Sequence, residues 1–505
     1  MHLDQPRNQL LLGTFVHSKS RREIDIFHNA AVAVDSNGKI AAVERQCSNL
    51  EVAKAHALAK LGWSVDDVDI YTTKESQFFF PGFIDTHIHA PQYPNAGIFG
   101  KTTLLDWLEK HTFPMEVSLK DLAKARKVYT AVVRRTLCHG TTTAAYYATI
   151  DVAATNLLTD LCHAIGQRAF VGRVCMDRAE INPDYYRDES TEAALRATRQ
   201  TIEHIRAVDP AFDLVAPILT PRFAPSCTSE GMRALAKLQR EGGFLAQTHI
   251  SENTNEIALV RELFPASRSY ADVYDQHGLL TPGMVLAHAV HLTEEEADLI
   301  ALRRSKVSHC PCSNSSLTSG AARVRWMWQK GIEVGLGTDV SGGYSPSILE
   351  AARQAALVSR HVAATRHNGD GDQEDHERCK LTVEEVLYLA TRGGALCLGL
   401  EDRVGGFEVG KDWDAQLVGL GRVADSGLRE GEEYTANGHG SGPAVNSAVA
   451  GAGFVVPAFN GSDEGNVDVF GWESWGEILA KWLYNGDDRN TKKVWVKGRL
   501  VHARR

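Results

Sequence analysis

Apolar runs near both ends of the chain predict β-structure. Near the amino terminus, the apolar residues 31–34 and 39–43 flank the sequence Asp-Ser-Asn-Gly at 35–38. An Asn-Gly pair between two apolar runs is a strong β-hairpin signal, because both residues accept the positive φ angles of a tight turn. Residues 414–418 and 493–501 are again strand-like. We therefore expect one small sheet domain assembled from both termini.

Between these ends, eight short apolar runs alternate with helix-compatible stretches such as residues 228–240, 293–303 and 347–360. Alternating strands and helices favour parallel βα units, and eight units fit a (β/α)8 barrel of the α/β class. A doubly wound open sheet is the competing topology. We prefer the barrel because polar, ligand-type residues follow many of the strands, where barrel enzymes build their sites. The expected strands are residues 82–89, 141–147, 169–175, 213–221, 244–249, 285–291, 306–310 and 333–339.

A segment near residues 422–466 breaks this pattern, since it is rich in Gly, Ser, Ala and Glu. We interpret it as an inserted surface loop. The expected organisation is a small domain from residues 1–78 and 408–505, which carries the insert, and a barrel domain from residues 79–407.

Composition narrows the functional classes. Of the 505 residues, 43% are hydrophobic and 23% are charged, as in ordinary globular domains, and the formal charge is −9. Without a basic excess to neutralise phosphates, we expect no nucleic-acid partner. The sequence contains no apolar run of about 18 residues, so we expect no membrane span. The start Met-His-Leu-Asp-Gln lacks the pattern of a secretory signal, and nine scattered cysteines show no disulfide-framework spacing, so we expect a cytoplasmic protein.

The sequence Pro-Gly-Phe-Ile-Asp-Thr-His-Ile-His at residues 81–89 carries the first chemical signal. Residues i and i+2 of a strand share one face, so His87 and His89 would present two imidazoles about 6–7 Å apart at Cα. Further candidate ligands stand at later strand ends, namely His249, His288 and Asp339. Three imidazoles and a carboxylate suit a borderline cation such as Zn²⁺ with one position open for water. Such a water becomes a nucleophile near neutral pH.

Four motifs extend this pattern into a family resemblance. They are His-Ala-Pro-Gln at 89–92, Thr-Pro-Arg-Phe at 220–223, His-Ile-Ser-Glu-Asn at 249–253 and Gly-Thr-Asp-Val-Ser-Gly-Gly-Tyr at 337–344. In this order they resemble the guanine deaminases of the amidohydrolase superfamily, and the resemblance covers nearly the whole chain outside the insert. It implies a distorted (β/α)8 TIM-like barrel with a small β-sandwich built from both termini. One departure is Cys312, at a position where that family usually has Asn.

The resemblance also implies roles for the candidate residues. His87, His89, His249 and Asp339 would hold one zinc ion per chain, and His288 would face the bound water without being a main ligand. Strand four reads Ala-Pro-Ile-Leu-Thr at 216–220, with no lysine where two-metal relatives place a bridging one. Glu252 would carry protons between water and the ring, with Asp339 accepting the proton of the water. The alternative for Glu252 is a carboxylate at a helix N-terminus.

Guanine recognition has its own candidates. The O6 and N7 atoms of guanine are two acceptors on one edge, and the guanidinium of Arg222 matches them. Gln92 offers both a donor and an acceptor for another edge, and Phe223 could stack on the ring. The alternatives are an ion pair at the barrel rim for Arg222 and core packing for Phe223.

With this resemblance, the sequence predicts zinc-dependent hydrolysis of guanine to xanthine and ammonia in purine catabolism. Because relatives in this family are commonly dimers, the resemblance also implies a homodimer. A related deaminase for another purine, a pyrimidine or a triazine is the alternative. A non-catalytic relative of the same fold would have lost metal ligands, and every expected ligand is present here.

Overall fold

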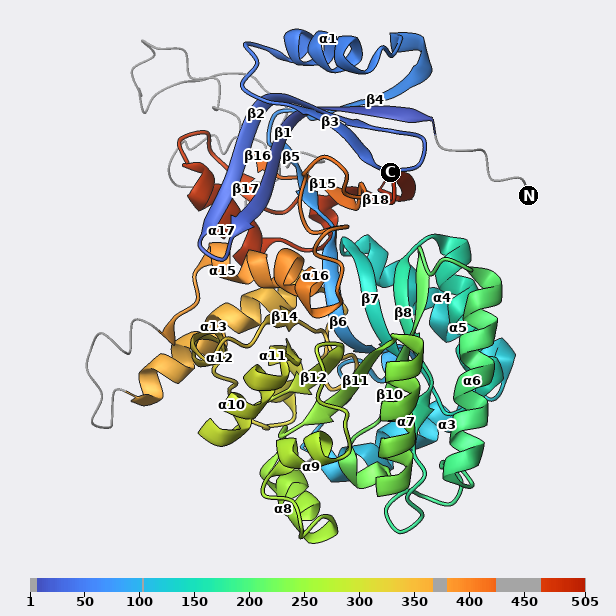
Figure 1. The fold of residues 1–505 in the computed structure, drawn as a ribbon. Helices are drawn as coiled ribbons and strands as arrows, with labels where there is room; N and C mark the ends of the chain where they lie inside the picture. Colours follow the sequence, from blue (N-terminus) through green and yellow to red (C-terminus); the bar gives the residue numbers. More distant parts are fainter. Residues whose placement is uncertain (1–6, 102–103, 367–378, 424–464, 505) are drawn as a thin grey trace, which may run out of the picture.

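The computed structural model describes residues 7–101, 104–366, 379–423 and 465–504. In these residues a parallel sheet forms a barrel (Figure 1), with the strands side by side in chain order and the short β9 (Val174–Cys175) beside β10. The eight main strands are β6 (Phe83–His89), β7 (Thr141–Tyr147), β8 (Arg168–Gly172), β10 (Val215–Pro221), β11 (Leu245–Ile250), β12 (Met284–His288), β13 (Lys306–His309) and β14 (Val334–Leu336).

Backbone hydrogen bonds join the last strand region to the first. The amide of Asp339 donates to the carbonyl of His87 at 2.9 Å, and the amide of His89 donates to the carbonyl of Val340 at 3.0 Å. The Thr86 hydroxyl also donates to the carbonyl of Leu336 at 2.8 Å. The closing seam of the barrel therefore runs through segments that carry candidate ligands.

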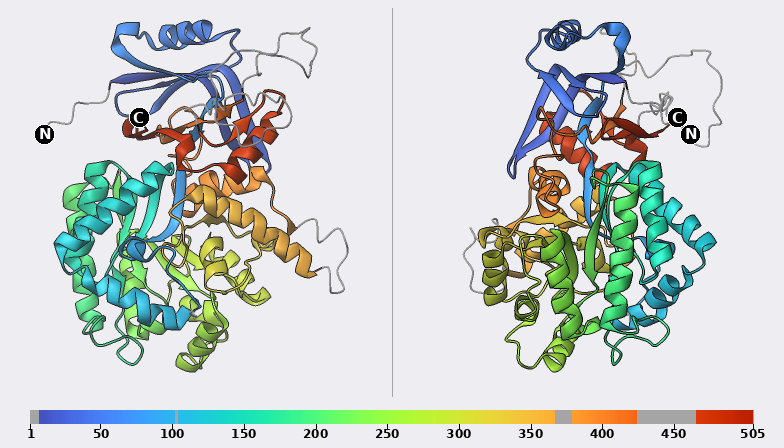
Figure 2. Two further views of the ribbon diagram at one scale, coloured as in Figure 1. Left: turned by 180° about the vertical axis from the view of Figure 1, so that it is seen from behind. Right: turned by 45° about the vertical axis from the view of Figure 1, so that its right-hand side comes forward.

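Helices cover the outside of the barrel (Figure 2), as expected when each parallel strand is followed by a crossover. Thr293 and Glu296 form a capping box at the start of α10 (Glu294–Arg303), which satisfies backbone N–H groups of its first turn. The helices around the strands are α4 (Leu122–Cys138), α5 (Val152–Ile165), α6 (Thr191–Val208), α7 (Ser229–Gly242), α8 (Thr254–Leu263), α9 (Tyr270–Gln276), α10 (Glu294–Arg303), α11 (Pro311–Ser316), α12 (Val324–Gln329), α13 (Ile348–Arg366), α15 (Val383–Tyr388) and α16 (Gly394–Cys397).

The second sheet is built from both ends of the chain, as the sequence predicts. Side chains alternate along β1: Leu10 and Leu12 pack with α1 (Leu50–Leu61), which lies over the outer face, whereas Leu11 packs with the aromatic cluster around Trp413. The strands are β1 (Asn8–Ser20), β2 (Glu23–Val34), β3 (Ile40–Glu44), β4 (Val68–Thr72), β5 (Gln77–Pro81), β15 (Ala415–Gly419), β18 (Thr491–Val496) and β19 (Arg499–Ala503).

The predicted hairpin between β2 and β3 is confirmed, with Val34 paired to Ile40. Gly38 in its turn has φ +78°, and a Cβ there would lie 2.0 Å from the carbonyl oxygen of Lys497. Glycine is therefore required both by the backbone conformation and by the close approach of the β18–β19 turn.

Several predicted strand limits are wrong. The strand expected at residues 169–175 breaks at Arg173 into β8 and β9, and both pieces pair with β10. Residues 493–501 form two strands of a hairpin, because Lys497 and Gly498 both have positive φ and reverse the chain. The expected strand at 285–291 ends at His288, and the one at 333–339 is confined to Val334–Leu336.

The insert expected near 422–466 lies mainly in residues 424–464, outside the described residues. On its flanks, β16 (Gly421–Arg422) pairs with β17 (Asp468–Val469), and α17 (Trp475–Asn485) follows. The domain limits at 78/79 and 407/408 stay predictions, and β5 runs across the first of them. In the described part of the chain, no helix combines the length and apolarity needed to cross a membrane.

Candidate active site

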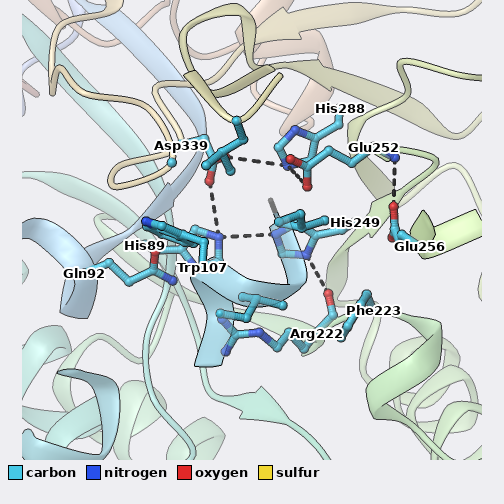
Figure 3. A pocket seen from close by; sticks show the side chains of 14 residues that line it. His89, Gln92, Trp107, Arg222, Phe223, His249, Glu252, Glu256, His288 and Asp339 are labelled. Atoms are coloured by element: carbon cyan, nitrogen blue, oxygen red, sulfur yellow. Dashed lines mark hydrogen bonds and ion pairs between the residues drawn. The ribbon is translucent and has the colours of Figure 1, made fainter. Parts of the chain in front are cut away.

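Three imidazoles and one carboxylate meet at the carboxyl ends of the barrel strands, and Figure 3 shows His89, His249 and Asp339 among them. His87 and His89 end β6, His249 lies in β11, and Asp339 follows β14. Oδ1 of Asp339 lies 3.0 Å from Nε2 of His87 and 3.4 Å from Nε2 of His89, whose Nε2 is 3.3 Å from Nε2 of His249. Ligand atoms of all four lie within 4.8 Å of one another, so this metal group can converge on one ion.

The chemistry of the metal group fits a divalent cation. Nδ1 of His249 donates to the carbonyl oxygen of Arg222 at 2.6 Å, which leaves the lone pair on Nε2. Burial lowers the pKa of all three imidazoles, which favours the neutral form that binds a metal. Burial alone would raise the pKa of Asp339, but His87, His288 and His89 outweigh it and hold that pKa well below its usual range. Nε2 of His87 is buried and, although it lies 3.0 Å from Oδ1 of Asp339, makes no well-aligned hydrogen bond in the described chain, so it is free to bind a cation.

His288 and Glu252 lie beside the metal group. Nε2 of His288 is 3.4 Å from Oε2 of Glu252 and 3.6 Å from Oδ2 of Asp339. Nδ1 of His288 lies 2.8 Å from Oδ1 of Asn314 and donates to it, which directs Nε2 toward the two carboxylates. The hydroxyl of Ser319 donates to Oε1 of Glu252 at 3.0 Å. One oxygen of Glu252 is thus fixed, while the other faces the imidazole.

Two of these residues have a left-handed backbone conformation, with φ 73° at His288 and 47° at Asp339. For residues other than glycine this costs on the order of 1 kcal/mol or more, and such residues concentrate at functional sites. The left-handed turn at His288 also explains why β12 ends there.

A pocket opens over this cluster. It is polar on the side of the metal group and apolar where Leu104, Trp107, Leu108 and Leu317 line it. A few converging polar groups in a mainly apolar cleft are typical of small-molecule sites. The other lining residues are His89, Gln92, Arg222, Phe223, His249, Glu252, Glu256, His288, Asp339 and Gly342.

The three predicted recognition residues all line this pocket. Arg222 follows β10, Gln92 lies in a short turn after β6, and Phe223 packs with its ring centroid 6.5 Å from that of His249. Arg222 also forms the ion pair considered as an alternative, with Glu116, but this pair is buried. Arg222 thus forms the ion pair and also lines the pocket, and its role in guanine recognition stays a prediction.

Sequence reasoning missed several residues of the site. Glu116 and Trp107 belong to the connection between β6 and α4, far from any predicted strand end. Asn314 lies in α11, two positions after Cys312, which is buried in the largest hydrophobic cluster. For Glu256 the sequence does hold a signal, because Asn253 and Glu256 have the spacing of a capping box. In the structure, the Glu256 carboxylate accepts hydrogen bonds from the backbone amides of Glu252 and Asn253.

Comparisons with known proteins agree with this geometry. The amidohydrolase family model matches residues 78–501. A probable guanine deaminase of Schizosaccharomyces pombe is 45% identical over 97% of this chain and 83% of its own length. The human guanine deaminase is 36% identical over 98% of this chain and 97% of its own length.

Among solved structures, the guanine deaminase of C. acetobutylicum, determined with guanine in its active site, superposes with a TM-score of 0.78. It is 29% identical, and the match covers 98% of this chain and 100% of that one. From its barrel, its metal group and these similarities, the chain belongs to the amidohydrolase family, within which it groups with the guanine deaminases.

Proposed function

We propose that this protein is a zinc-dependent guanine aminohydrolase, which converts guanine and water into xanthine and ammonia. The observation that carries the proposal is the meeting, in one pocket, of His89, His249 and Asp339 of the metal group with Arg222 and Gln92. The resemblance to guanine deaminases over nearly the whole chain supports the same substrate.

His87, His89, His249 and Asp339 would hold one zinc ion. Neutral imidazole nitrogens and an ionised carboxylate oxygen are suitable zinc ligands. When bound, zinc acts as a Lewis acid that lowers the pKa of a coordinated water.

The ring of guanine would lie between the apolar residues of the pocket and Phe223, with its O6 and N7 edge toward Arg222 and another edge toward Gln92. Adenine would place an amino group against the same donors, leaving unpaired polar groups at a cost of about 1–3 kcal/mol each. This difference would favour guanine.

Glu252 would move the protons. Burial raises its pKa to about 7, so near neutral pH the carboxyl group can both take up a proton and release one. It would pass one proton of the water to the ring nitrogen as the water oxygen adds to C2. It would then pass the proton of the added hydroxyl to the amino nitrogen, so that a C=O bond forms while the C–N bond breaks and ammonia leaves. His288 would orient Glu252, because Asn314 fixes its ring.

A metal assay combined with a substrate panel tests this function. We expect close to one zinc per chain. We also expect guanine to be consumed, as followed by the loss of its ultraviolet absorbance, and ammonia to be released. A preference for adenine, cytosine or a triazine would support the alternative of a different deaminase. The homodimeric state and the cytoplasmic location stay predictions.

A further inference from the structure

A buried carboxylate behind the recognition residues stands out from the rest of the pocket. Glu116 lies in α3 (Phe113–Ser118), on the connection between β6 and α4, and is 1% exposed. Its side chain is not part of the pocket lining, so it acts on a ligand only through other residues.

Four hydrogen bonds converge on the two oxygens of Glu116. Nη1 of Arg222 donates to Oε2 at 2.8 Å, and Nη2 donates to Oε1 at 3.1 Å. Nε2 of Gln92 donates to Oε1 at 2.8 Å, and the hydroxyl of Tyr186 donates to Oε2 at 2.6 Å. A carboxylate accepts about four hydrogen bonds, so the acceptor capacity of Glu116 is filled. We conclude that its task is to hold its donors in place.

The bidentate geometry fixes the plane of the Arg222 guanidinium. Two parallel bonds from a planar fork to a carboxylate allow one relative orientation, whereas a single bond would permit rotation. The ring of Phe113, one helical turn from Glu116, lies with its centroid 5.1 Å from Cζ of Arg222. Helix α3 therefore holds the guanidinium by an ion pair and a ring contact, and the negative charge offsets the cost of burying the cation.

The same carboxylate decides which way the Gln92 amide points. An ionised carboxylate is acceptor-only, so the NH₂ group of Gln92 has to face Glu116. The amide oxygen then accepts a long, 3.4 Å hydrogen bond from the backbone N–H of Ser341. One carboxylate thus sets the orientation of both polar residues proposed to read the ring.

We propose that Glu116 is a positioning residue for substrate selection, which locks Arg222 and Gln92 into a single arrangement. The inference rests on the proposed function, because it assigns those two residues to recognition of the purine ring. It adds that selectivity depends on a third group, which itself does not touch the substrate.

The test is a double-mutant cycle. Glu116→Gln keeps the size of the side chain but removes the charge and replaces an acceptor by a donor. We expect guanine kcat/KM to fall at least about tenfold, and the preference for guanine over adenine to narrow, because displacement of positioning groups is costly. Zinc content should be unchanged. In an Arg222→Ala background, the same Glu116→Gln change should cost much less, since its main target is gone.

Two controls separate positioning from general loss of stability. Tyr186→Phe removes one hydrogen bond from the same carboxylate but leaves its bonds to Arg222 and Gln92, so selectivity should be preserved. Asp188→Asn breaks another buried ion pair, with Arg173, outside the pocket lining. It should lower the melting temperature without changing the guanine-to-adenine ratio.

An unchanged guanine-to-adenine ratio in Glu116→Gln would overturn the inference, as would an equal loss in the presence and absence of Arg222. Failure of the proposed function would be seen separately, as wild-type protein that prefers another ring. In that case the Glu116→Gln and Arg222→Ala cycle is measured with the substrate that the wild type prefers. An unchanged preference, or an equal loss with and without Arg222, would again overturn the inference.

Discussion

Glu252 and His288 face each other inside the pocket, with Oε2 of the carboxylate 3.4 Å from Nε2 of the imidazole. Burial raises the pKa of Glu252 to about 7. Burial alone would lower the pKa of His288, but Glu252 and Asp339 outweigh it and raise that pKa above its usual value. A proton can therefore be shared between the two side chains near neutral pH, which is what a proton carrier needs.

Replacing Glu252 by Gln should separate proton transfer from metal binding. The amide can still accept the hydrogen bond from Ser319, so we expect the fold and the zinc content to be kept. Turnover of guanine should fall by at least ~10²-fold, because the amide cannot carry a proton. Ser319→Ala, which removes a contact of the same carboxylate, should cost far less. Near-normal kcat in Glu252→Gln would show that the carboxylate is structural.

Removal of the metal should abolish activity. We expect His87→Ala to lose both zinc and turnover, since one of four ligands is gone, and strong chelators to inactivate the wild type. Elemental analysis alongside the guanine assay measures both. His204→Ala is a suitable control, because this imidazole is outside the metal group and pairs with Asp160. Two tightly bound ions, or full activity of metal-free protein, would contradict the one-metal mechanism.

Arg222→Ala should reduce guanine kcat/KM by an amount equivalent to ~2–4 kcal/mol, because it removes the proposed partner of O6 and N7. Discrimination against adenine should narrow, since the opposing donors disappear as well. Steady-state kinetics with guanine, adenine and cytosine check this. Arg173→Ala, which removes an arginine just as deeply buried from a different ion pair, should leave the ratio unchanged. An intact guanine value in Arg222→Ala would refute the guanine assignment.

His17 should make the protein less stable in acid. Its Nδ1 accepts from the backbone N–H of Phe407 at 3.2 Å, and its Nε2 lies 3.2 Å from Oδ2 of Asp25, so the neutral ring is satisfied on both sides. Burial is the main reason why its pKa is lowered to about 4. The unfolded chain would bind a proton at its ordinary pKa of about 6.5 before the folded protein does, so stability is full above that pH and falls as the pH drops toward 4.

For this one residue, the free energy of unfolding should be about 2 kcal/mol lower at pH 5 than at pH 7. His17→Gln keeps a donor and an acceptor but does not titrate. Between pH 7 and pH 5 its free energy of unfolding should therefore fall by about 2 kcal/mol less than that of the wild type. Urea unfolding at both pH values provides the comparison. The same pH dependence in both proteins would mean that His17 is not its source.

Much of the barrel could be predicted because its strands are local apolar runs. The strand at Thr141–Tyr147 has the predicted limits, and the hairpin around Gly38 follows from its Asn-Gly pair. Two of the errors arise where a single backbone angle decides, at Lys497 and His288, whose positive φ reverses or ends a strand within an apolar run. Such angles are rare for these residue types and leave little trace in composition.

The metal group could be predicted because its members lie at the ends of strands or just after them, and parallel strand ends meet at one edge. The role of Glu116 could not be predicted from the sequence. Its partners Gln92, Tyr186 and Arg222 lie on separate connections that only the folded chain brings together. The roles proposed for Glu252 and His288 come from the family resemblance, whereas the distance between them could be known only from the structure.

The seam that closes the barrel gives the protein a reporter of metal occupancy that needs no substrate. The amides of Asp339 and His89 bond across this seam to the carbonyls of His87 and Val340, so three of the residues joined there also belong to the metal group. An ion held by those side chains would tie the first strand of the barrel to the segment after the last one. Exchange of these two amides with deuterated solvent should therefore slow on metal loading, whereas exchange within the β2–β3 hairpin should stay the same.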